Sequence, residues 1–549
     1  MKRILSIILL LLLTLPTYKI LFSAGYFPMH DDTQPSRIFV MAKALSLGQF
    51  PVRLVPGLGY SYGYPLFNFY APLPYYIGSF FFFLSKDIII ATKAMFLLGF
   101  ILATISMFFL GRQVGGTLGG IFSSLLYTYA PYHAVNLYVR GAVGELYAYG
   151  ILPFVLLALI KIIKGRLKEG FIIGSISIGA LLLSHNILGL IMFYTLALFS
   201  VVYLVNIFLS KKKYTPFLVI VSMIITGIGL SAFFTVPALL EAKYTKIETL
   251  TEGTSNFKSH FVYLDQLWDS PWGYAGSSLG RSDGMSFKIG KILLLAAASI
   301  FTISVWRRSQ LYLILASLTL FFISLFLMLD ISTKVWETVP YFPFIQYPWR
   351  FLNLSLLFLC LIAAGITKII PSHKLSILIC FVVITLTIVT QSKNFTPRYL
   401  YPPDPTKFIS AESLKFDISK ISDEYLPNDL QVPRTKEELP KETVEIIKDE
   451  PTEKIYNIKA NDPRNLDMNM AFFPGWKGEF NNRPILIKNR NGKINIDLPQ
   501  IKKGILKLQF LDTPIRTIAN SISFLSLILV VYVSLFGVRI IWPKSPRSK

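Results

Sequence analysis

Cysteine is almost absent from this 549-residue chain, which has two, Cys360 and Cys380, both inside long apolar segments. A disulfide framework or a cysteine metal site therefore has no support in the sequence. Charged residues are also scarce, at 15%, whereas 53% of the residues are hydrophobic and 14% are aromatic. Such a composition is too apolar for a soluble enzyme of this length, so we expect a polytopic α-helical membrane protein.

Motifs for nucleotide binding are missing as well. The chain has no P-loop and no G-x-G-x-x-G segment after a strand, which argues against direct use of a nucleotide cofactor. Its histidines are scattered, so a histidine zinc site could form only through folding.

Acidic residues are outnumbered, with 31 against 54 basic residues and a formal net charge of +23. Basic proteins often bind nucleic acids, but here Lys and Arg cluster in short loops between apolar runs, as they do in the cytoplasmic loops of membrane proteins. The charge therefore indicates topology and contact with membrane lipids. We expect no nucleic acid partner, and the sequence points to no protein partner.

Long apolar runs predict about twelve transmembrane helices. They cover residues 4–22, 88–111, 117–132, 145–163, 170–185, 187–209, 216–239, 289–306, 310–329, 351–369, 374–391 and 518–541. Segment 67–84 is also apolar, but a crossing there would move every later basic loop to the other side of the membrane. We therefore interpret it as a juxtamembrane or re-entrant helix, which leaves both termini cytoplasmic and the chain in the cell membrane.

This predicted topology divides the chain into three parts. Residues 1–391 form the transmembrane domain, whose first outer loop covers 23–87. Residues 392–516 form an extracytoplasmic linker and a small β-sandwich, and 517–549 hold the last helix and a basic cytoplasmic tail. Short alternating runs and the turn signal Asn491-Gly492 predict the sandwich, with strands at 443–448, 454–459, 466–473, 485–488, 493–498 and 505–510. The aromatic stretch 472–476 suits either an exposed loop that binds sugar or headgroup, or core packing.

Two adjacent acids, Asp31 and Asp32, follow the first predicted span, beside His30 and ahead of a helix expected to begin near residues 33–35. A helix N-terminus stabilises anions, so both acids can stay ionised there. One carboxylate could then act as a catalytic general base. The same residues could hold a divalent cation through oxygen ligands, with His30 as a nitrogen ligand. The alternative without function is a helix cap, in which Asp32 or Thr33 satisfies free backbone N–H groups.

Arginines on the same side are candidates for binding phosphate, because a guanidinium matches phosphate oxygens in a bidentate fork. Arg37 follows the acidic pair and Arg53 lies beyond the next helix; for each, contact with lipid headgroups is the alternative. Arg350 opens the tenth predicted span and is placed to meet a lipid-linked phosphate. Arg140 and Glu145 lie at the outer end of the fourth span, where a glutamate is costly unless paired or wet. They form either part of a substrate site or a structural ion pair.

Two further polar positions are predicted on the outer side. His185 and Asn186 lie at the turn between the fifth and sixth spans, where they either bind substrate or cap two helix ends. Asp269 lies between Trp268 and Trp272 in the loop after the seventh span, which could cover an acceptor while the aromatic rings stack on sugar. An interfacial tryptophan belt is the alternative.

The first outer loop also carries a family resemblance. After the acidic pair come a helix ending in ALSLGQFP at 44–51, then YPLFNFY at 64–70 and PLPYY at 72–76. This arrangement resembles the first outer loop of GT-C glycosyltransferases and, more closely, the membrane family labelled 6-pyruvoyl-tetrahydropterin synthase-related. The label does not describe chemistry here, because the pterin enzyme is a small soluble protein with a three-histidine zinc site that this chain does not match. The resemblance implies a catalytic acid in this loop, and His185-Asn186 and Arg350 fit the family pattern.

By this resemblance the chain is a GT-C-like glycosyltransferase that moves a sugar from a polyprenyl-phosphate-linked donor to a lipid, glycan or protein acceptor on the outer face. The residues expected at the site are catalytic Asp31 and Asp32, and substrate-binding His30, Arg37, Arg140, Glu145, His185, Asn186, Asp269 and Arg350. A non-catalytic protein for lipid-glycan transport or envelope assembly is the alternative, and a pseudoenzyme is a third. The sequence has no inverted repeat and its acids crowd the outer boundary, which favours the enzyme.

Overall fold

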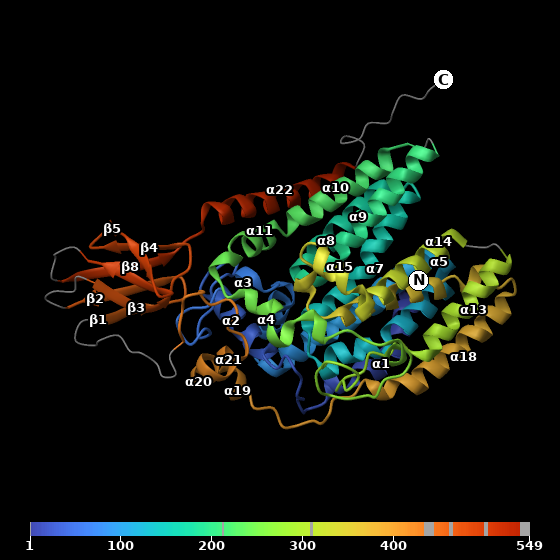
Figure 1. Ribbon diagram of the computed structural model, residues 1–549, viewed down its shortest axis with the longest axis horizontal. Coiled ribbons are helices and arrows are strands. Elements are labelled where there is room, and N and C mark those ends of the chain that lie inside the picture. The colour runs from blue at the N-terminus through green and yellow to red at the C-terminus, as the bar shows by residue number, and fades with distance from the viewer. Residues whose placement is uncertain are drawn as a thin grey trace, which may run out of the picture.

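The structure is a computed structural model that describes residues 2–210, 213–307, 311–432, 444–459, 465–498 and 503–537. A bundle of long helices makes up most of the molecule, and two β-sheets stand together at one end of it (Figure 1). The predicted basic tail after residue 537 and the end of the predicted linker, 433–443, lie outside the described residues.

All twelve apolar segments predicted from the sequence are helical where the structure describes them. The helices are α1 (Lys2–Tyr18), α5 (Ile88–Thr128), α7 (Val143–Ile163), α8 (Leu167–Ser184), α9 (Asn186–Leu209), α10 (Thr215–Leu230), α11 (Ala232–Leu240), α13 (Lys291–Arg307), α14 (Leu311–Met328), α16 (Leu352–Ala363), α18 (His373–Gln391) and α22 (Pro514–Phe536). Within the described ranges, eight helices are long and apolar enough to cross a membrane, or ten if each of two bent pairs counts as one span. The class of helical membrane protein with a β-sheet region is confirmed, whereas about twelve crossings stay a prediction.

Helix α5 contains two of the predicted spans. Its 41 residues would measure about 60 Å if straight, twice the thickness of the hydrocarbon core. The backbone leaves helical geometry at Gly115 and Gly116, the latter with φ of +66°. The hydroxyls of Thr104 and Thr128 then meet at 3.0 Å, and the Ser124 hydroxyl donates to the Thr104 carbonyl at 2.6 Å. The two halves therefore run antiparallel, as the predicted turn between 111 and 117 requires.

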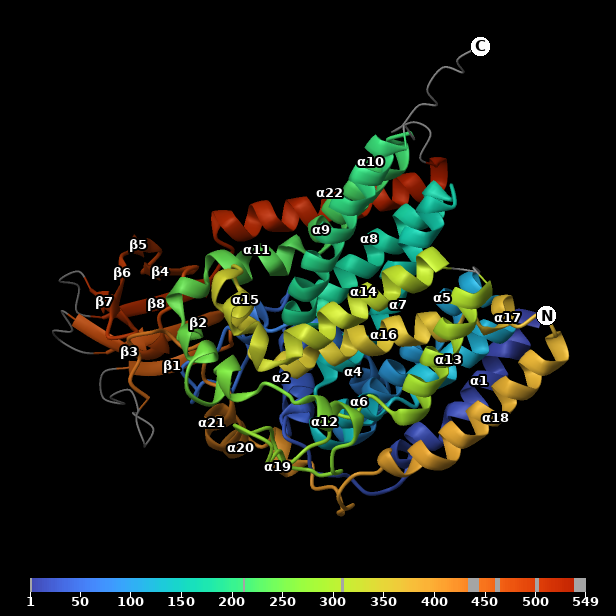
Figure 2. The ribbon, with the colours of Figure 1, turned by 45° about the vertical axis from the view of Figure 1, so that its right-hand side comes forward.

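Several helices turn large apolar side chains outward, as a lipid-facing surface requires. Examples are Leu295 on α13, Phe381 and Val389 on α18, and Phe524 and Leu525 on α22, all exposed in the isolated chain. Figure 2 shows α13 and α18 next to each other, at the edge of the bundle away from the β-sheets. A bilayer would bury this surface.

The first loop, residues 23–87, folds into three helices: α2 (Gln34–Ser46), α3 (Leu66–Phe69) and α4 (Leu73–Ser85). At about 1.5 Å per residue, the 13 residues of α4 measure about 20 Å, too short to span a bilayer, as expected for this segment. In the sequence, Ile38, Met41, Ala42 and Leu45 form an apolar stripe at i, i+3, i+4 and i+7, which predicts that α2 lies along the membrane surface, and this prediction is wrong. Ile38 is fully buried, and the Ser79 hydroxyl of α4 donates to its carbonyl at 3.2 Å.

Eight strands form two sheets, of five strands in the order β1-β2-β8-β4-β5 and of three in the order β3-β7-β6. The strands are β1 (Val444–Asp449), β2 (Glu453–Ile458), β3 (Asn465–Ala471), β4 (Trp476–Phe480), β5 (Arg483–Ile485), β6 (Ile487–Arg490), β7 (Lys493–Asp497) and β8 (Gly504–Phe510). Asn491 and Gly492 have φ of +52° and +76° and join β6 to β7, the predicted hairpin turn. Phe473 and Trp476 are 2% and 8% exposed, so the 472–476 stretch supplies core packing.

Most of the predicted linker packs against the rest of the protein. Its residues 395–430, here called the strap, contact the first loop. Tyr26 and Tyr401 exchange two backbone hydrogen bonds of 2.8 Å. The Tyr425 ring stacks on Phe69 with centroids 5.3 Å apart, and the Ser419 hydroxyl accepts from the Tyr60 N–H at 3.2 Å. The strap includes the short helices α19 (Thr406–Ile409), α20 (Ala411–Ser413) and α21 (Ser419–Ile421).

Candidate functional site

The acidic turn of the first loop is fixed by backbone hydrogen bonds to a segment more than 100 residues away. The N–H groups of His30 and Asp31 donate to the carbonyls of Val139 and Arg140 at 3.1 and 2.9 Å. One residue further, a Cβ at Gly141 would come within 2.2 Å of the Met29 sulfur, so only glycine permits this approach. Asp31 consequently lies beside Arg140, although the sequence separates the two residues widely.

Asp32 is the acid with unsatisfied hydrogen-bonding capacity. Its Oδ1 atom is buried and accepts no hydrogen bond from any residue that the structure describes. Thr33 takes the N-cap position of α2 without a side-chain capping bond, so the cap role that was the alternative for this pair is not realised. Three hydroxyls close by in sequence, those of Tyr26, Thr33 and Ser36, are likewise buried and unpartnered within the described ranges. Buried polar groups of this kind are normally satisfied by water or ligand.

Burial also changes the acidity of Asp32. Removal of water raises the pKa of its carboxyl to about 7, and the nearby ammonium of Lys407 opposes this rise. Lys407 belongs to α19 of the strap, whose next residue, Phe408, packs against Tyr26 with ring centroids 5.7 Å apart. The strap thus brings the Lys407 ammonium close to the Asp32 carboxyl, although the sequence predicts this segment only as a linker.

A buried cluster, here called the arginine–glutamate cluster, joins two of the predicted positions. Glu145 receives a salt bridge from Arg140 at 2.7 Å and a longer one from Arg350 Nε at 3.6 Å. Its other carboxylate oxygen accepts hydrogen bonds from the Tyr132 hydroxyl at 2.5 Å and the Asn353 amide at 2.8 Å. The start of α7 and the start of α16 therefore meet around one carboxylate.

The cluster holds more positive than negative charge. Arg140 and Arg350 share the single carboxylate of Glu145, and all three side chains are at most 9% exposed. The Arg140 guanidinium lies 4.4 Å from the Trp349 ring centroid, and that of Arg350 lies 4.8 Å from the Tyr347 ring centroid, so aromatic faces cover both cations. Two arginines with one buried counter-charge form a site suited to a further anion.

His185 and Asn186 join the same region at the turn between α8 and α9. A Cβ at Gly144 would come within 2.5 Å of the Ser184 carbonyl oxygen, so this turn rests directly on the start of α7. Burial, reinforced by the charge of Arg350, lowers the pKa of His185 to about 3, so its ring is neutral. Its Nδ1 accepts the Leu188 N–H at 3.0 Å, and the Asn186 amide donates to the Phe69 carbonyl at 3.2 Å. His185 thus caps the start of α9 and Asn186 anchors the turn to the first loop, whereas substrate binding by either residue stays a prediction.

Other predicted residues lie apart from this cluster. Arg37 is buried beneath the strap, 4.1 Å from the Tyr70 ring centroid and 3.4 Å from the Ser422 hydroxyl. Asp269 is solvent-exposed and forms an ion pair with Lys291 at 2.5 Å. The His30 ring contacts the Tyr274 carbonyl at 3.1 Å. In the part of the chain that the structure describes, no three His, Cys, Asp or Glu side chains gather as a metal site would require, and this includes His30 with the two acids.

Sequence reasoning missed three residues of this site. Asn353 follows Arg350 by three positions on one helix face, a spacing that could have indicated a shared site. Tyr132 was only the last residue of the predicted span 117–132. Lys407 carried no signal, because its segment is irregular and only the folded chain brings it to Asp32.

Comparisons with known proteins agree with the helical membrane architecture. The model of the family described as "6-pyruvoyl-tetrahydropterin synthase related domain; membrane protein" matches residues 67–398. A protein from Lactococcus lactis subsp. cremoris is 25% identical over 250 residues, which is 44% of this chain and 39% of that protein.

Three solved structures are among those that align with this chain. The oligosaccharyltransferase of Archaeoglobus fulgidus has a TM-score of 0.46 at 14% identity and matches 80% of this chain and 62% of its own. The arabinofuranosyltransferase AftD from Mycobacteria scores 0.43 at 13% identity, over 73% of this chain and 27% of its own. ArnT from Cupriavidus metallidurans, bound to undecaprenyl phosphate, scores 0.34 at 10% identity, over 71% and 89%. The match with the first of these spans less than two thirds of that protein's length.

Proposed function

The chain belongs to the membrane protein family described as the 6-pyruvoyl-tetrahydropterin synthase related domain, and we propose that it is a glycosyltransferase of the GT-C type acting at the membrane surface. The observation that carries this proposal is the docking of the acidic turn on Arg140, through the 2.9 Å hydrogen bond from Asp31. It sets the acidic turn beside Arg140, one of the two buried arginines, and the next residue in the turn, Asp32, has a buried carboxylate oxygen with no partner among the described residues. Transfer from a phosphate-linked sugar needs both a base and a site for the phosphate.

Asp32 is the proposed base. A general base works best when its pKa lies near the working pH, and burial brings Asp32 to about 7. It would take the proton from an acceptor hydroxyl or amine while that atom attacks the anomeric carbon. The bond from this carbon to the phosphate oxygen breaks at the same time, so polyprenyl phosphate leaves and the anomeric centre is inverted. Asp31 lies close enough to act electrostatically on Arg140, and we propose that it orients the turn.

The arginine–glutamate cluster is the proposed phosphate site. Arg140 and Arg350 can direct their remaining guanidinium N–H groups to phosphate oxygens while Glu145 holds their positions. The donor would be a sugar on polyprenyl phosphate, because nucleotide sugars are not available outside the cell. Its tail would lie among the lipid-facing helices, and the acceptor would be a lipid, glycan or protein.

The test of this function is a comparison of glycolipids and glycoconjugates in cells that express the protein and in cells that lack it. We expect at least one glycosylated species to disappear with the protein and its unmodified acceptor to accumulate. Mass spectrometry of lipid extracts and released glycans measures both. Identical profiles under conditions in which the protein is produced would contradict the proposal and favour the non-catalytic alternative.

A second expected result concerns orientation, because the proposal requires the first loop to face outward in the cell membrane, with both termini in the cytoplasm. A cysteine introduced at exposed Ser61 should react with an impermeant maleimide in intact cells, whereas one at exposed Lys168 should react only after permeabilisation. The two native cysteines, Cys360 and Cys380, are buried and give little background. Labelling of Lys168→Cys in intact cells would show that the orientation in the membrane is opposite to the one proposed.

A third expected result concerns Lys407, whose positive charge lowers the pKa of Asp32. In Lys407→Met the carboxyl should ionise at higher pH, so transfer should fall at neutral pH and recover as the pH is raised. The measurement is the pH dependence of glycolipid formation in membranes from expressing cells. Lys420→Met, which removes an exposed lysine from the same strap, should leave the profile unchanged. A uniform loss at every pH would instead indicate that Lys407 acts by holding the strap.

A further inference from the structure

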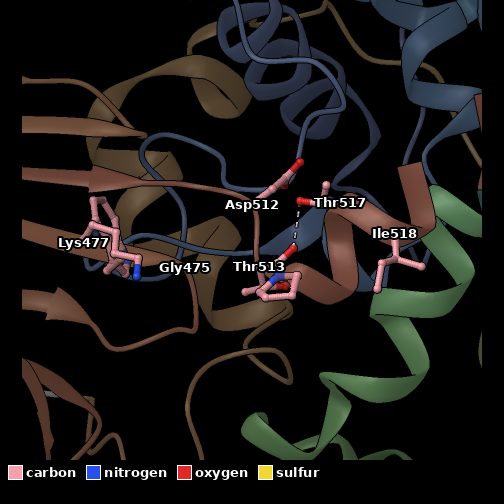
Figure 3. Close-up of a pocket in the computed structure, with 8 residues that line it drawn as sticks. Gly475, Lys477, Asp512, Thr513, Thr517 and Ile518 are labelled. Atoms are coloured by element: carbon pink, nitrogen blue, oxygen red, sulfur yellow. Dashed lines mark hydrogen bonds between the residues drawn. The ribbon is translucent and has the colours of Figure 1, made fainter. Parts of the chain in front are cut away.

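An open cavity of about 600 Å³ lies where the β-sheets meet the last helix (Figure 3). It is formed by the start of β4, the segment after β8 and the first turns of α22. Its lining residues are Gly475, Trp476, Lys477, Asp512, Thr513, Pro514, Thr517 and Ile518. Nothing in the proposed transfer reaction uses these residues.

The length of α22 places this cavity at the level of the lipid headgroups. The helix has 23 residues and measures about 35 Å, slightly more than the hydrocarbon thickness of a bilayer. Its first turn therefore lies at the membrane interface. Ile518, which forms one edge of the cavity in Figure 3, is 62% exposed and gives the opening an apolar edge.

Five charged side chains lie in or beside the cavity, and four of them form two ion pairs. Arg53 pairs with Asp512 at 3.2 Å, and Arg516 pairs with Glu241 at 3.0 Å, so these four groups cancel. Lys477 is exposed and has no ion-pair partner in the ranges that the structure describes. The two threonine hydroxyls of the lining are satisfied within the protein, because Thr517 donates to the Thr513 carbonyl at 3.2 Å (Figure 3) and Thr513 donates to the Glu241 carboxylate at 2.9 Å.

We propose that this cavity binds the phosphate headgroup of an anionic phospholipid, with Lys477 as the phosphate contact and the acyl chains running along Ile518. The position at the interface, the apolar edge and the single uncompensated cation all suit an amphiphile with a negative headgroup. A lipid held there contacts β4 and α22 together, so it fastens the β-sheets to the membrane domain. The inference does not depend on the proposed transferase activity.

The test compares the full-length protein in nanodiscs of phosphatidylcholine with and without phosphatidylglycerol. We expect the anionic lipid to raise the unfolding temperature and to remain bound in native mass spectrometry. Lys477→Gln should weaken retention about tenfold, the effect of losing one charge-assisted contact. Lys488→Gln, which removes an exposed lysine from β6, should retain the lipid as wild type does. Thr517→Trp, which fills the cavity and keeps the charge, should also lose the lipid.

Three outcomes would overturn the proposal. Retention of phosphatidylcholine equal to that of phosphatidylglycerol would show that the site does not distinguish the charge of the headgroup. Equal weakening by Lys488→Gln would show a general surface effect. Stabilisation of the detergent-solubilised protein by inorganic phosphate, abolished by Lys477→Gln, would assign the site to a soluble phosphate compound.

Discussion

Asp32→Asn is expected to abolish sugar transfer while the protein still folds and inserts. The amide keeps the size of the carboxyl but cannot take a proton from the acceptor, and removal of a general base typically costs about 100- to 10,000-fold in rate. The glycosylated species that depends on this protein should therefore fall to the level of cells that lack it. Asp31→Asn, in the neighbouring half-exposed residue, should have a smaller effect, because the base is still present.

The same substitution should stabilise the protein above neutral pH. The folded pKa of Asp32, about 7, lies above the ordinary value near 4, so the folded state holds a proton that the unfolded chain has released. This contribution is fully present below about pH 4 and is lost as the pH rises through about 7. Asp32→Asn carries no such dependence, so it should unfold at a higher temperature than wild type at pH 8.

These two readouts separate a catalytic acid from a structural one. Loss of transfer together with a gain in stability is the pattern of a residue kept for function at a cost to folding. Loss of both would identify Asp32 as part of the packing. If Asp31→Asn and Asp32→Asn both leave the glycolipid profile intact, the base mechanism fails and a transport or assembly role becomes the better account.

The helical architecture could be predicted because span length and apolar composition are properties of each segment alone. Segment length also predicts the turn at Gly115 and Gly116 and the break at His185. At about 1.5 Å per residue, a single helix through either place would be about twice as long as the hydrocarbon core is thick. The strands were harder: β4 (Trp476–Phe480) was missed, because it has five residues and a central Gly478. Its turn to β5 uses Asn481 and Asn482 with φ of +49° and +62°, a signal that was present in the sequence.

Which surface an apolar stripe meets could not be predicted from periodicity. The stripe of α2 fits a membrane interface and a protein core equally well, and the choice is made by α4 folding over it. Local sequence likewise placed Arg140, His185 and Arg350 near helix ends, but only helix packing determines that these ends meet around Glu145. The acidic pair could be singled out from the sequence because its two carboxyls are adjacent in the chain.

Glu145→Gln is expected to be strongly destabilising, by about 3–5 kcal/mol, the cost of leaving buried charges without their partner. Glutamine can still accept from Tyr132 and Asn353, so the packing is conserved and the charge alone is lost. Arg140 and Arg350 would then face each other without a counter-ion. Thermal unfolding of detergent-solubilised protein, followed by size-exclusion chromatography, measures the loss. An unfolding temperature equal to that of wild type would contradict this account of the cluster.

A charge-balanced double variant then decides whether the cluster binds substrate or only holds the fold. Arg140→Gln combined with Glu145→Gln restores the net charge of one buried cation, so much of the stability lost in the single variant should return. If the pair serves phosphate binding, transfer should stay low despite the recovered fold, because one guanidinium is missing and Arg350 has lost its positioning partner. If transfer returns together with stability, Arg140 and Glu145 form a structural ion pair, and the phosphate must be bound elsewhere.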